Sequence, residues 1–300
     1  MGAQLRAVRA RIRAVKSIAK ITRAQELIAS SRIIRAQQRT RAAEPYAREL
    51  LTAVEAVVSR STSITHPMIS EPASYANAAV LILTSDGGFC GAFNANVLRE
   101  ASRLRQRNDE NGVRSHTYVA GRKGIAWHRF RDIPLVGEWA GFSAQPTYAD
   151  AEKIALTLLD AFTESKTVDE IYLVSTEFVS MLTQRPAVRR LLPLEIEEKE
   201  GERPGGALPA YEFEPSTEDV LDALLPQYVA SRIYYAMLES AASELAARRR
   251  AMKAATDNAN DLIDRLTRQA NNARQAEITQ EISEIVGGAN ALAEANAGRE

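Results

Sequence analysis

Ala78-Ala-Val-Leu-Ile-Leu-Thr84 is apolar at six successive positions and is followed directly by the turn residues Ser85-Asp-Gly-Gly88. A short apolar run that ends in a glycine turn is typical of a strand buried in a parallel sheet. Glu170-Ile-Tyr-Leu-Val-Ser175 has the same character, and Tyr118-Val-Ala120 is a shorter candidate. Between these strands, apolar residues recur at helical spacing, which predicts helices over 92–106, 122–131 and 147–164. One more strand is expected over 190–196. This order predicts an α/β domain with a parallel sheet.

Long stretches on both sides of this domain are almost free of glycine and proline. From Gly2 to Val58 only Pro45 interrupts good helix formers, and a kink or break is expected there. From Thr217 to Val286 only Pro226 does so, near the start of the stretch. At ~1.5 Å per residue the first helix would be roughly 85 Å long, and the stretch from Gln227 to Val286 roughly 90 Å, so the two are expected to be similar in length. Gly287-Gly288 is a natural stop for the second one, but alanine-rich sequence resumes beyond it, so the sequence leaves the end of this helix open.

Each terminal stretch carries a narrow apolar stripe at spacings of three and four. In the first the stripe runs from Leu5 to Ala19 and then becomes polar at Thr22 and Glu26. In the second it is rich in alanine (Leu245, Met252, Ala255, Ala259, Leu262, Leu266, Ala270, Ala273). Long helices with so narrow a stripe are seldom stable alone, so we expect the two to pair antiparallel as a coiled coil. The α/β domain is then an insertion between them.

The charges are balanced overall but unevenly distributed. The 38 basic and 38 acidic side chains cancel, which excludes a strong pull of the whole molecule toward nucleic acid or anionic lipid. Residues 1–41 hold nine arginines and two lysines against Glu26, a net charge of +10, whereas residues 195–219 carry −7. The basic helix admits four interpretations: a nucleic-acid arm, a membrane-surface helix, a partner-facing helix, or a coiled coil that arginine merely solvates. It has no aromatic residue for base stacking and no clean apolar face for a membrane.

Little in the chain points to chemistry of its own. Gly87, Gly88 and Gly91 do not form a dinucleotide-binding or P-loop pattern, and Asp86 is more typical of a turn aspartate than of a catalytic carboxylate. The histidines are scattered without metal-ligand spacing (His66, His116, His128). The lone Cys90 excludes an intramolecular disulfide and is expected to be a small buried residue. We therefore expect no catalytic residue, no bound metal and no cofactor.

Neither a signal peptide nor a membrane span is expected. The first thirty residues contain no apolar run of the kind that a signal peptide needs, and the longest apolar runs fall far short of the ~20 residues that cross a bilayer. Any membrane association is therefore expected to go through partner proteins.

Two longer motifs stand out at the C-terminal end and in the turn after the first strand: Ile278-Thr-Gln-Glu-Ile-Ser-Glu-Ile-Val-Gly-Gly-Ala289 and Ser85-Asp-Gly-Gly-Phe-Cys-Gly-Ala-Phe-Asn94. The first is similar to the C-terminal signature of the gamma subunit of bacterial F-type ATP synthases, and the second resembles the Ser-Asp-Arg-Gly-Leu-Cys-Gly motif of that family. Gly87 here stands where arginine or lysine is usual. Three shorter matches follow the family order (Lys20 to Ala29, Ala247 to Asn258, Ala273 to Ala276), so the resemblance covers the whole chain.

The resemblance implies a fold class and a function. The fold is an α/β type: a long antiparallel coiled coil of the N- and C-terminal helices with an inserted Rossmann-like α/β domain that binds no nucleotide. The expected division is a shaft helix over 1–60, the α/β domain with an acidic foot over 75–215, and a second shaft helix over 216–300. The implied function is that of the central-stalk rotor, which is not itself an enzyme and transmits torque between proton-driven c-ring rotation and the catalytic sites on beta subunits.

The resemblance also assigns contact residues and partners. One set would meet the beta subunits (Arg9, Lys16, Lys20, Arg23, Gln25, Arg274, Gln275, Thr279, Glu281, Glu284), with Asp86 and Gly87 in a turn that meets a beta-subunit loop. Another would meet the epsilon subunit and the c-ring (Tyr211, Glu212, Phe213, Glu214). The implied partners are the alpha, beta and epsilon subunits and the c-ring, with no nucleic acid. The implied location is the cytoplasmic face of the bacterial plasma membrane, which the chain meets only through the complex.

Two assignments of other classes remain open at this point. One is an α/β enzyme with coiled-coil oligomerisation arms, and the other is a nucleic-acid-binding coiled coil that uses the basic first helix. The enzyme would be stabilised by its substrate or cofactor, and the nucleic-acid binder would show salt-sensitive binding.

Overall fold

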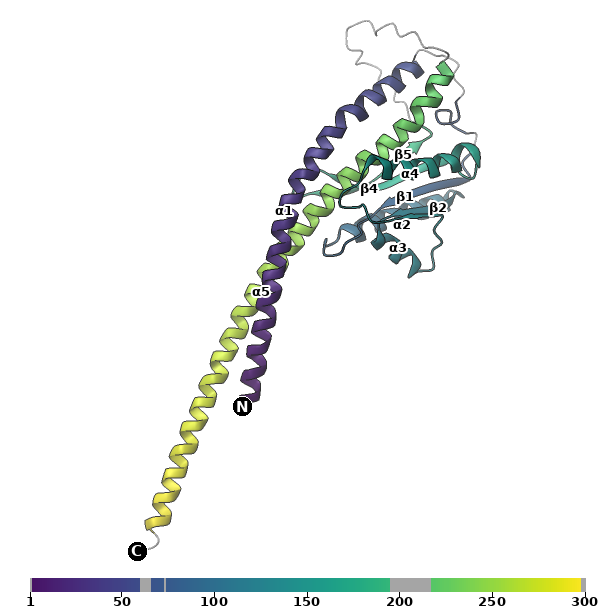
Figure 1. The fold of residues 1–300 in the computed structure, drawn as a ribbon. Coiled ribbons are helices and arrows are strands. Elements are labelled where there is room, and N and C mark those ends of the chain that lie inside the picture. Colours follow the sequence, from purple (N-terminus) through teal and green to yellow (C-terminus); the bar gives the residue numbers. More distant parts are fainter. Residues whose placement is uncertain (1, 60–65, 73, 195–216, 298–300) are drawn as a thin grey trace. The chain divides into compact units, whose positions relative to one another are not determined.

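The computed structural model describes residues 2–59, 66–72, 74–194 and 217–297 (Figure 1). Two long helices, α1 (Gly2–Ser59) and α5 (Thr217–Ala297), enclose all other elements in the sequence. Between them the order is that of an α/β domain: β1 (Asn77–Leu83), α2 (Phe93–Glu110), β2 (Arg114–Ala120), α3 (Arg122–Arg129), β3 (Gly137–Trp139), α4 (Tyr148–Leu159) with a π-helical turn (Asp160–Glu164), β4 (Glu170–Phe178) and β5 (Gln184–Leu192). The expected fold class is confirmed.

The two terminal helices differ from expectation in length. Helix α1 runs through Pro45 without a break, so of the kink or break expected there the break does not occur. Helix α5 has 81 residues against 58 in α1, and it continues through Gly287 and Gly288 to Ala297. A glycine inside a helix costs only about 1 kcal/mol relative to alanine, so two glycines do not by themselves end it. The prediction of similar lengths was therefore wrong, and the end of the second helix, which the sequence left open, lies at Ala297.

The sheet has five strands in the order β3-β2-β1-β4-β5. Strands β1 to β4 are parallel, as expected, whereas β5 pairs antiparallel with β4. The strand expected at 190–196 therefore begins earlier, at Gln184, and forms a hairpin with β4. Strand β3 has only three residues and no apolar run, so the sequence pattern did not indicate it.

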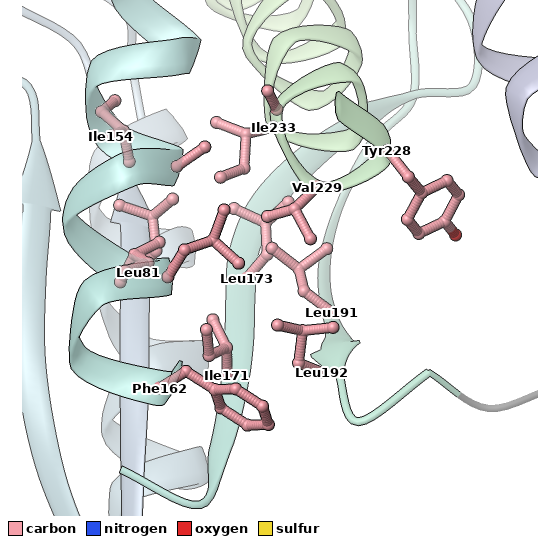
Figure 2. Packing of buried hydrophobic residues seen from close by; sticks show 14 of the residues in the cluster. Leu81, Ile154, Phe162, Ile171, Leu173, Leu191, Leu192, Tyr228, Val229 and Ile233 are labelled. Carbon is pink, nitrogen blue, oxygen red and sulfur yellow. The ribbon is translucent and has the colours of Figure 1, made fainter. Parts of the chain in front are cut away.

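The two faces of the sheet bury different helices. On one face Val80 and Ile82 of β1 pack with Val97 and Leu98 of α2. On the other face Leu81 and Leu173 join a larger cluster with α4 and with parts of α1 and α5. Figure 2 shows this second face, where side chains of α4 and α5 meet those of the strands (Leu81, Ile154, Phe162, Ile171, Leu173, Leu191, Leu192, Val229, Ile233). The α/β domain is thus covered on both sides, as a parallel sheet requires.

By their internal contacts the residues divide into two compact units. One comprises 1–28 with 250–300, and the other comprises 29–249. The second unit contains the sheet with the adjoining parts of α1 and α5, and the first contains only helix. The three-part division into 1–60, 75–215 and 216–300 stays a prediction.

The helices of the first unit pair antiparallel along the expected stripe. Leu5 and Val8 pack with Leu266 and Ala270 near the start of α1. Further along α1, Thr22 meets an earlier residue of α5, Thr256, with 2.7 Å between the hydroxyl oxygens. The stripe of α5 differs at two positions, because Thr256 is buried at 9% exposure whereas Leu262 is 38% exposed. A hydroxyl pair therefore occupies part of a seam that was expected to be apolar.

Ala259→Trp tests this pairing, because Ala259 is only 7% exposed. A large side chain cannot fit a close-packed seam without displacing the opposite helix, at a cost of about 1–3 kcal/mol. We expect a lower melting temperature of the helical signal in circular dichroism. The control is Asn260→Trp at the next, exposed position. Equal melting temperatures of the two variants would contradict the pairing.

Candidate functional site

The ten residues assigned to beta-subunit contact all lie in the first unit and are all exposed. None of them belongs to the buried seam that Leu5, Val8, Leu266 and Ala270 form. Most of their local bonds stay within one helix: Arg23 pairs with Glu26 at 2.8 Å, and the Thr279 hydroxyl donates to the Gln275 carbonyl at 2.9 Å. The unit thus presents charged and amide groups to solvent on both helices. This arrangement suits charge-assisted contacts with a partner.

Exposed apolar side chains accompany these charges. Ile18 and Ile21 on α1 are 52% and 62% exposed. On α5 a second group recurs at helical spacing and is at least 44% exposed (Ile278, Ile282, Ile285, Val286). The sequence analysis did not single out this second group, although its spacing is visible in the sequence. Exposed apolar stripes of this kind mark surfaces that meet other proteins.

Asp86, in the turn after β1, is held by backbone groups from two other segments. Its Oδ1 accepts the N–H of Arg122 at 3.1 Å, and its Oδ2 accepts those of Gly141 and Ser143 at 2.9 and 3.0 Å. In return the Asp86 N–H donates to the Ser143 hydroxyl at 2.8 Å. The carboxylate therefore ties together three loops at the carboxyl end of the parallel strands. Burial would raise the pKa of Asp86, but these hydrogen bonds outweigh burial and hold that pKa below its ordinary value.

The neighbouring loop at Gly121 approaches β1 so closely that only glycine fits. Gly121 has φ of +115°, and a Cβ there would lie 2.2 Å from the Thr84 carbonyl oxygen. The Thr84 hydroxyl in turn accepts the N–H of Gly124 at 3.0 Å. The start of α3 is thereby fixed beside the Asp86 turn.

Arg248 of α5 reaches the same turn from the other side. Its Nη2 donates to the Gly88 carbonyl at 3.2 Å and to Glu244 Oε1 at 2.6 Å. A Cβ at Gly87 would lie 3.0 Å from that Nη2. Burial raises the pKa of Glu244, and the pairing with Arg248 only partly offsets it. Sequence reasoning noted the absent cation at position 87 but missed Arg248, because its contact with the turn joins residues 160 positions apart.

The remaining candidates for chemistry lie apart from one another. Cys90 is buried, and its sulfur lies 3.3 Å from the Asn94 side-chain nitrogen. His66, His116 and His128 bond to three separate partners, namely Asp222, Asn77 and the Gly124 carbonyl. Among the described residues, no group of three metal-ligating side chains comes together. The four foot residues assigned to epsilon and c-ring contact, Tyr211 to Glu214, lie outside the described residues.

Asp86→Asn is expected to destabilise the chain at neutral pH by about 1–3 kcal/mol, since hydrogen bonds to a charged acceptor are replaced by weaker ones. Because the folded-state pKa of Asp86 is lowered, its contribution is present above the unfolded pKa of about 4 and is lost as the pH falls through the folded value. The difference in unfolding free energy between wild type and variant should therefore become smaller below about pH 4. Urea unfolding at pH 7 and pH 3.5 measures this change.

The control is Asp109→Asn, on the exposed side of α2. The role assigned to the Asp86 carboxylate would be contradicted if both variants lost the same unfolding free energy relative to wild type. It would also be contradicted if the loss in Asp86→Asn stayed constant on acidification.

Comparisons with known proteins agree with one another. The family model described as ATP synthase matches residues 4–292. The ATP synthase gamma chain of Acidothermus cellulolyticus is 58% identical, over 97% of this chain and 98% of the relative. That of Thermobifida fusca is 55% identical over the full length of both chains.

Solved structures share the fold at low identity. A chain of the Euglena gracilis mitochondrial ATP synthase matches all of this chain and 97% of its own length, with a TM-score of 0.69 and 17% identity. Because the family model and the full-length relatives cover nearly every residue, this chain belongs to the ATP synthase gamma chain family.

Proposed function

We propose that this chain is the central-stalk rotor subunit of an F-type ATP synthase. It transmits torque between proton-driven rotation of a c-ring and the catalytic sites on beta subunits. The observation that carries the proposal is full-length membership of the gamma chain family, and the antiparallel helix pair with outward-facing charges supports it. ATP is made or hydrolysed by other chains, so this subunit is not itself catalytic.

The helix pair suits coupling by differential contact. A ligand or partner shifts a conformational equilibrium only as far as its contacts differ between the two states. The charged set on the first unit is uneven around the helix pair: basic on α1 (Arg9, Lys16, Lys20, Arg23) and mixed on α5 (Arg274, Glu281, Glu284). Each beta subunit would therefore meet a different surface as the rotor turns, and that difference would select its open or closed state.

The other partners follow from the same assignment. The alpha and beta subunits would surround the first unit, and the epsilon subunit and the c-ring loops would meet the acidic segment that contains Tyr211 to Glu214. No helix among the described residues is long and apolar enough to cross a membrane. We place the chain at the cytoplasmic face of the bacterial plasma membrane, held there through the complex.

The turn at Asp86 and Gly87 would be a second beta-subunit contact. Arg248 lies beside Gly88, so this chain carries a positive charge next to the position where the family motif has one. The geometry of this turn also argues against the alternative assignment as an α/β enzyme. The three backbone N–H groups that could cradle a phosphate at the carboxyl end of the strands are engaged by the chain's own Asp86.

Native mass spectrometry of the complex that copurifies with a tagged chain from gently washed membranes tests the proposal. We expect one copy of this chain with several alpha and beta subunits. Recovery as a free homo-oligomer, or together with nucleic acid, would overturn the rotor assignment.

Arg274→Ala tests the contact set. Losing one charge-assisted contact that differs between beta-subunit states should change the ATP hydrolysis rate of the assembled complex by about fivefold or more. The matched control is Arg268→Ala, which is also exposed on α5 but outside the set. Equal rates for both variants and wild type would remove Arg274 from the set.

Gly87→Arg tests the turn. The new side chain adds a positive charge to the turn and displaces the end of the Arg248 side chain, whose Nη2 lies 3.0 Å from the position of a Cβ at Gly87. We expect an altered ATPase rate or altered inhibition in the reconstituted complex. Gly88→Ala is the control, because a Cβ there meets only the flexible end of Lys123 at 3.7 Å. Unchanged kinetics of Gly87→Arg would refute a role for this turn.

A further inference from the structure

A small cavity between α2, α3 and β2 has no role in the functions above. Its volume is about 10 Å³, which is the space of one water-sized group. Polar side chains make up much of its lining (Ser102, Arg105, Ser115, Thr117, Trp127, His128). The cavity lies on the face of the sheet opposite to the cluster of α4 and α5. The accessible lining is more apolar than polar, and these polar side chains supply its hydrogen-bonding groups.

His128 leaves one ring nitrogen unused at this cavity. The residue is 3% exposed, and its Nδ1 lies 2.8 Å from the Gly124 carbonyl oxygen. Because a carbonyl only accepts, Nδ1 carries a hydrogen and Nε2 is the atom that gains the second proton. Within the part of the chain that the structure describes, Nε2 has no hydrogen-bond partner.

Two hydroxyl groups of β2 can donate at the same place. Thr117 is 7% exposed, and its hydroxyl has no partner among the described residues. The Ser115 hydroxyl accepts from the Asn108 side chain at 3.2 Å and keeps its own hydrogen to donate. Thr117 is buried and Ser115 only partly buried, and each hydroxyl keeps a hydrogen that an acceptor in the cavity could take.

Two arginines bring positive charge to the cavity. Arg105 of α2 lines it, and Arg131, just after α3, stacks on Trp127 with 4.2 Å between the guanidinium carbon and the ring centre. Burial chiefly lowers the pKa of His128, and both arginines lower it further. No carboxylate contributes to that shift, and neither arginine pairs with an acid among the described residues. The cluster therefore offers donors and positive charge without a matching anion.

We propose that this cavity binds the phosphate group of a small ligand. One phosphate oxygen would occupy the cavity and accept from Thr117 and Ser115, and the others would lie between Arg105 and Arg131. The cavity admits only one oxygen-sized group, so the rest of the ligand stays outside. Protonated His128 adds a third cation and a further donor, so binding strengthens as the pH falls. The charged groups that face His128 are Arg105 from α2 and Arg131 after α3, and β2 contributes only hydroxyl groups.

Histidine ring signals in NMR test the site on the full-length chain, which has only three histidines. Inorganic phosphate is titrated at constant ionic strength, with sodium chloride as the balancing salt. We expect a saturable shift of the His128 signals and a rise of its pKa, while those of His66 and His116 stay unchanged. This result does not depend on the rotor assignment, because it needs neither the complex nor ATPase activity.

Arg105→Gln and Arg131→Gln should each raise the phosphate concentration that half-saturates the His128 shift about tenfold. This is the effect expected for the loss of one hydrogen bond to a charged group. The matched control is Arg103→Gln, also on α2, because Arg103 pairs with Glu100 at 3.1 Å and does not line the cavity. The control should leave phosphate affinity unchanged. Unchanged His66 and His116 signals show that each variant is folded.

Two further titrations separate the sources of the phosphate group. ADP offers it on a nucleotide, and vesicles of phosphatidylglycerol in phosphatidylcholine offer it on a lipid surface. The probe with the lowest half-saturating concentration identifies the source. The proposal is overturned if His128 shows no saturable response to any probe, or if both arginine variants respond like wild type.

Discussion

The burial of α5 on more than one side is the constraint on which the rest of the second unit depends. From Leu225 to Ala247 most residues of this helix are buried, far more than one amphipathic stripe would supply. Val229 and Ile233 pack into the cluster on the sheet, whereas Leu245 and Ala246 pack with Ile33 of α1. Because α5 takes part in both clusters, the sheet and helix α1 both pack against this one helix.

The same helix fixes the turn after β1. Arg248 follows this buried segment and bonds the Gly88 carbonyl, while Asp86 gathers the N–H groups of three residues from two other segments. The turn is therefore held from both sides, by a cation from α5 and by its own anion. Gly121 is a glycine for a steric reason, since a Cβ there would meet the Thr84 backbone, whereas a Cβ at Gly87 would meet only the end of the Arg248 side chain. A surface of this kind is pre-ordered, which reduces the entropy lost when a partner binds it.

The two faces of the sheet support different surfaces of the molecule. One face supports α4 and the terminal helices, and this support holds the Asp86 turn beside α5. The other carries α2 and α3, whose arginines and buried His128 surround the proposed phosphate cavity. A parallel sheet buried on both faces can hold two such surfaces independently. Variants at Arg105 or Arg131 should therefore leave the rotor contacts unaffected.

Local patterns in the sequence were sufficient for the terminal helices, strands β1 and β4, and the expectation of an antiparallel pair. Apolar runs and stripes report burial directly, because an element must cover its apolar face wherever it forms. The short β3 and the beginning of the polar edge strand β5 had no such local signal, and the sequence left the end of α5 open. The resemblance to known motifs suggested contact residues that periodicity alone could not, and these stay a prediction. The Arg248 contact with Gly88, the three bonds to Asp86 and the grouping of Arg105, Arg131 and His128 depend on tertiary structure, since each joins side chains that only folding brings together.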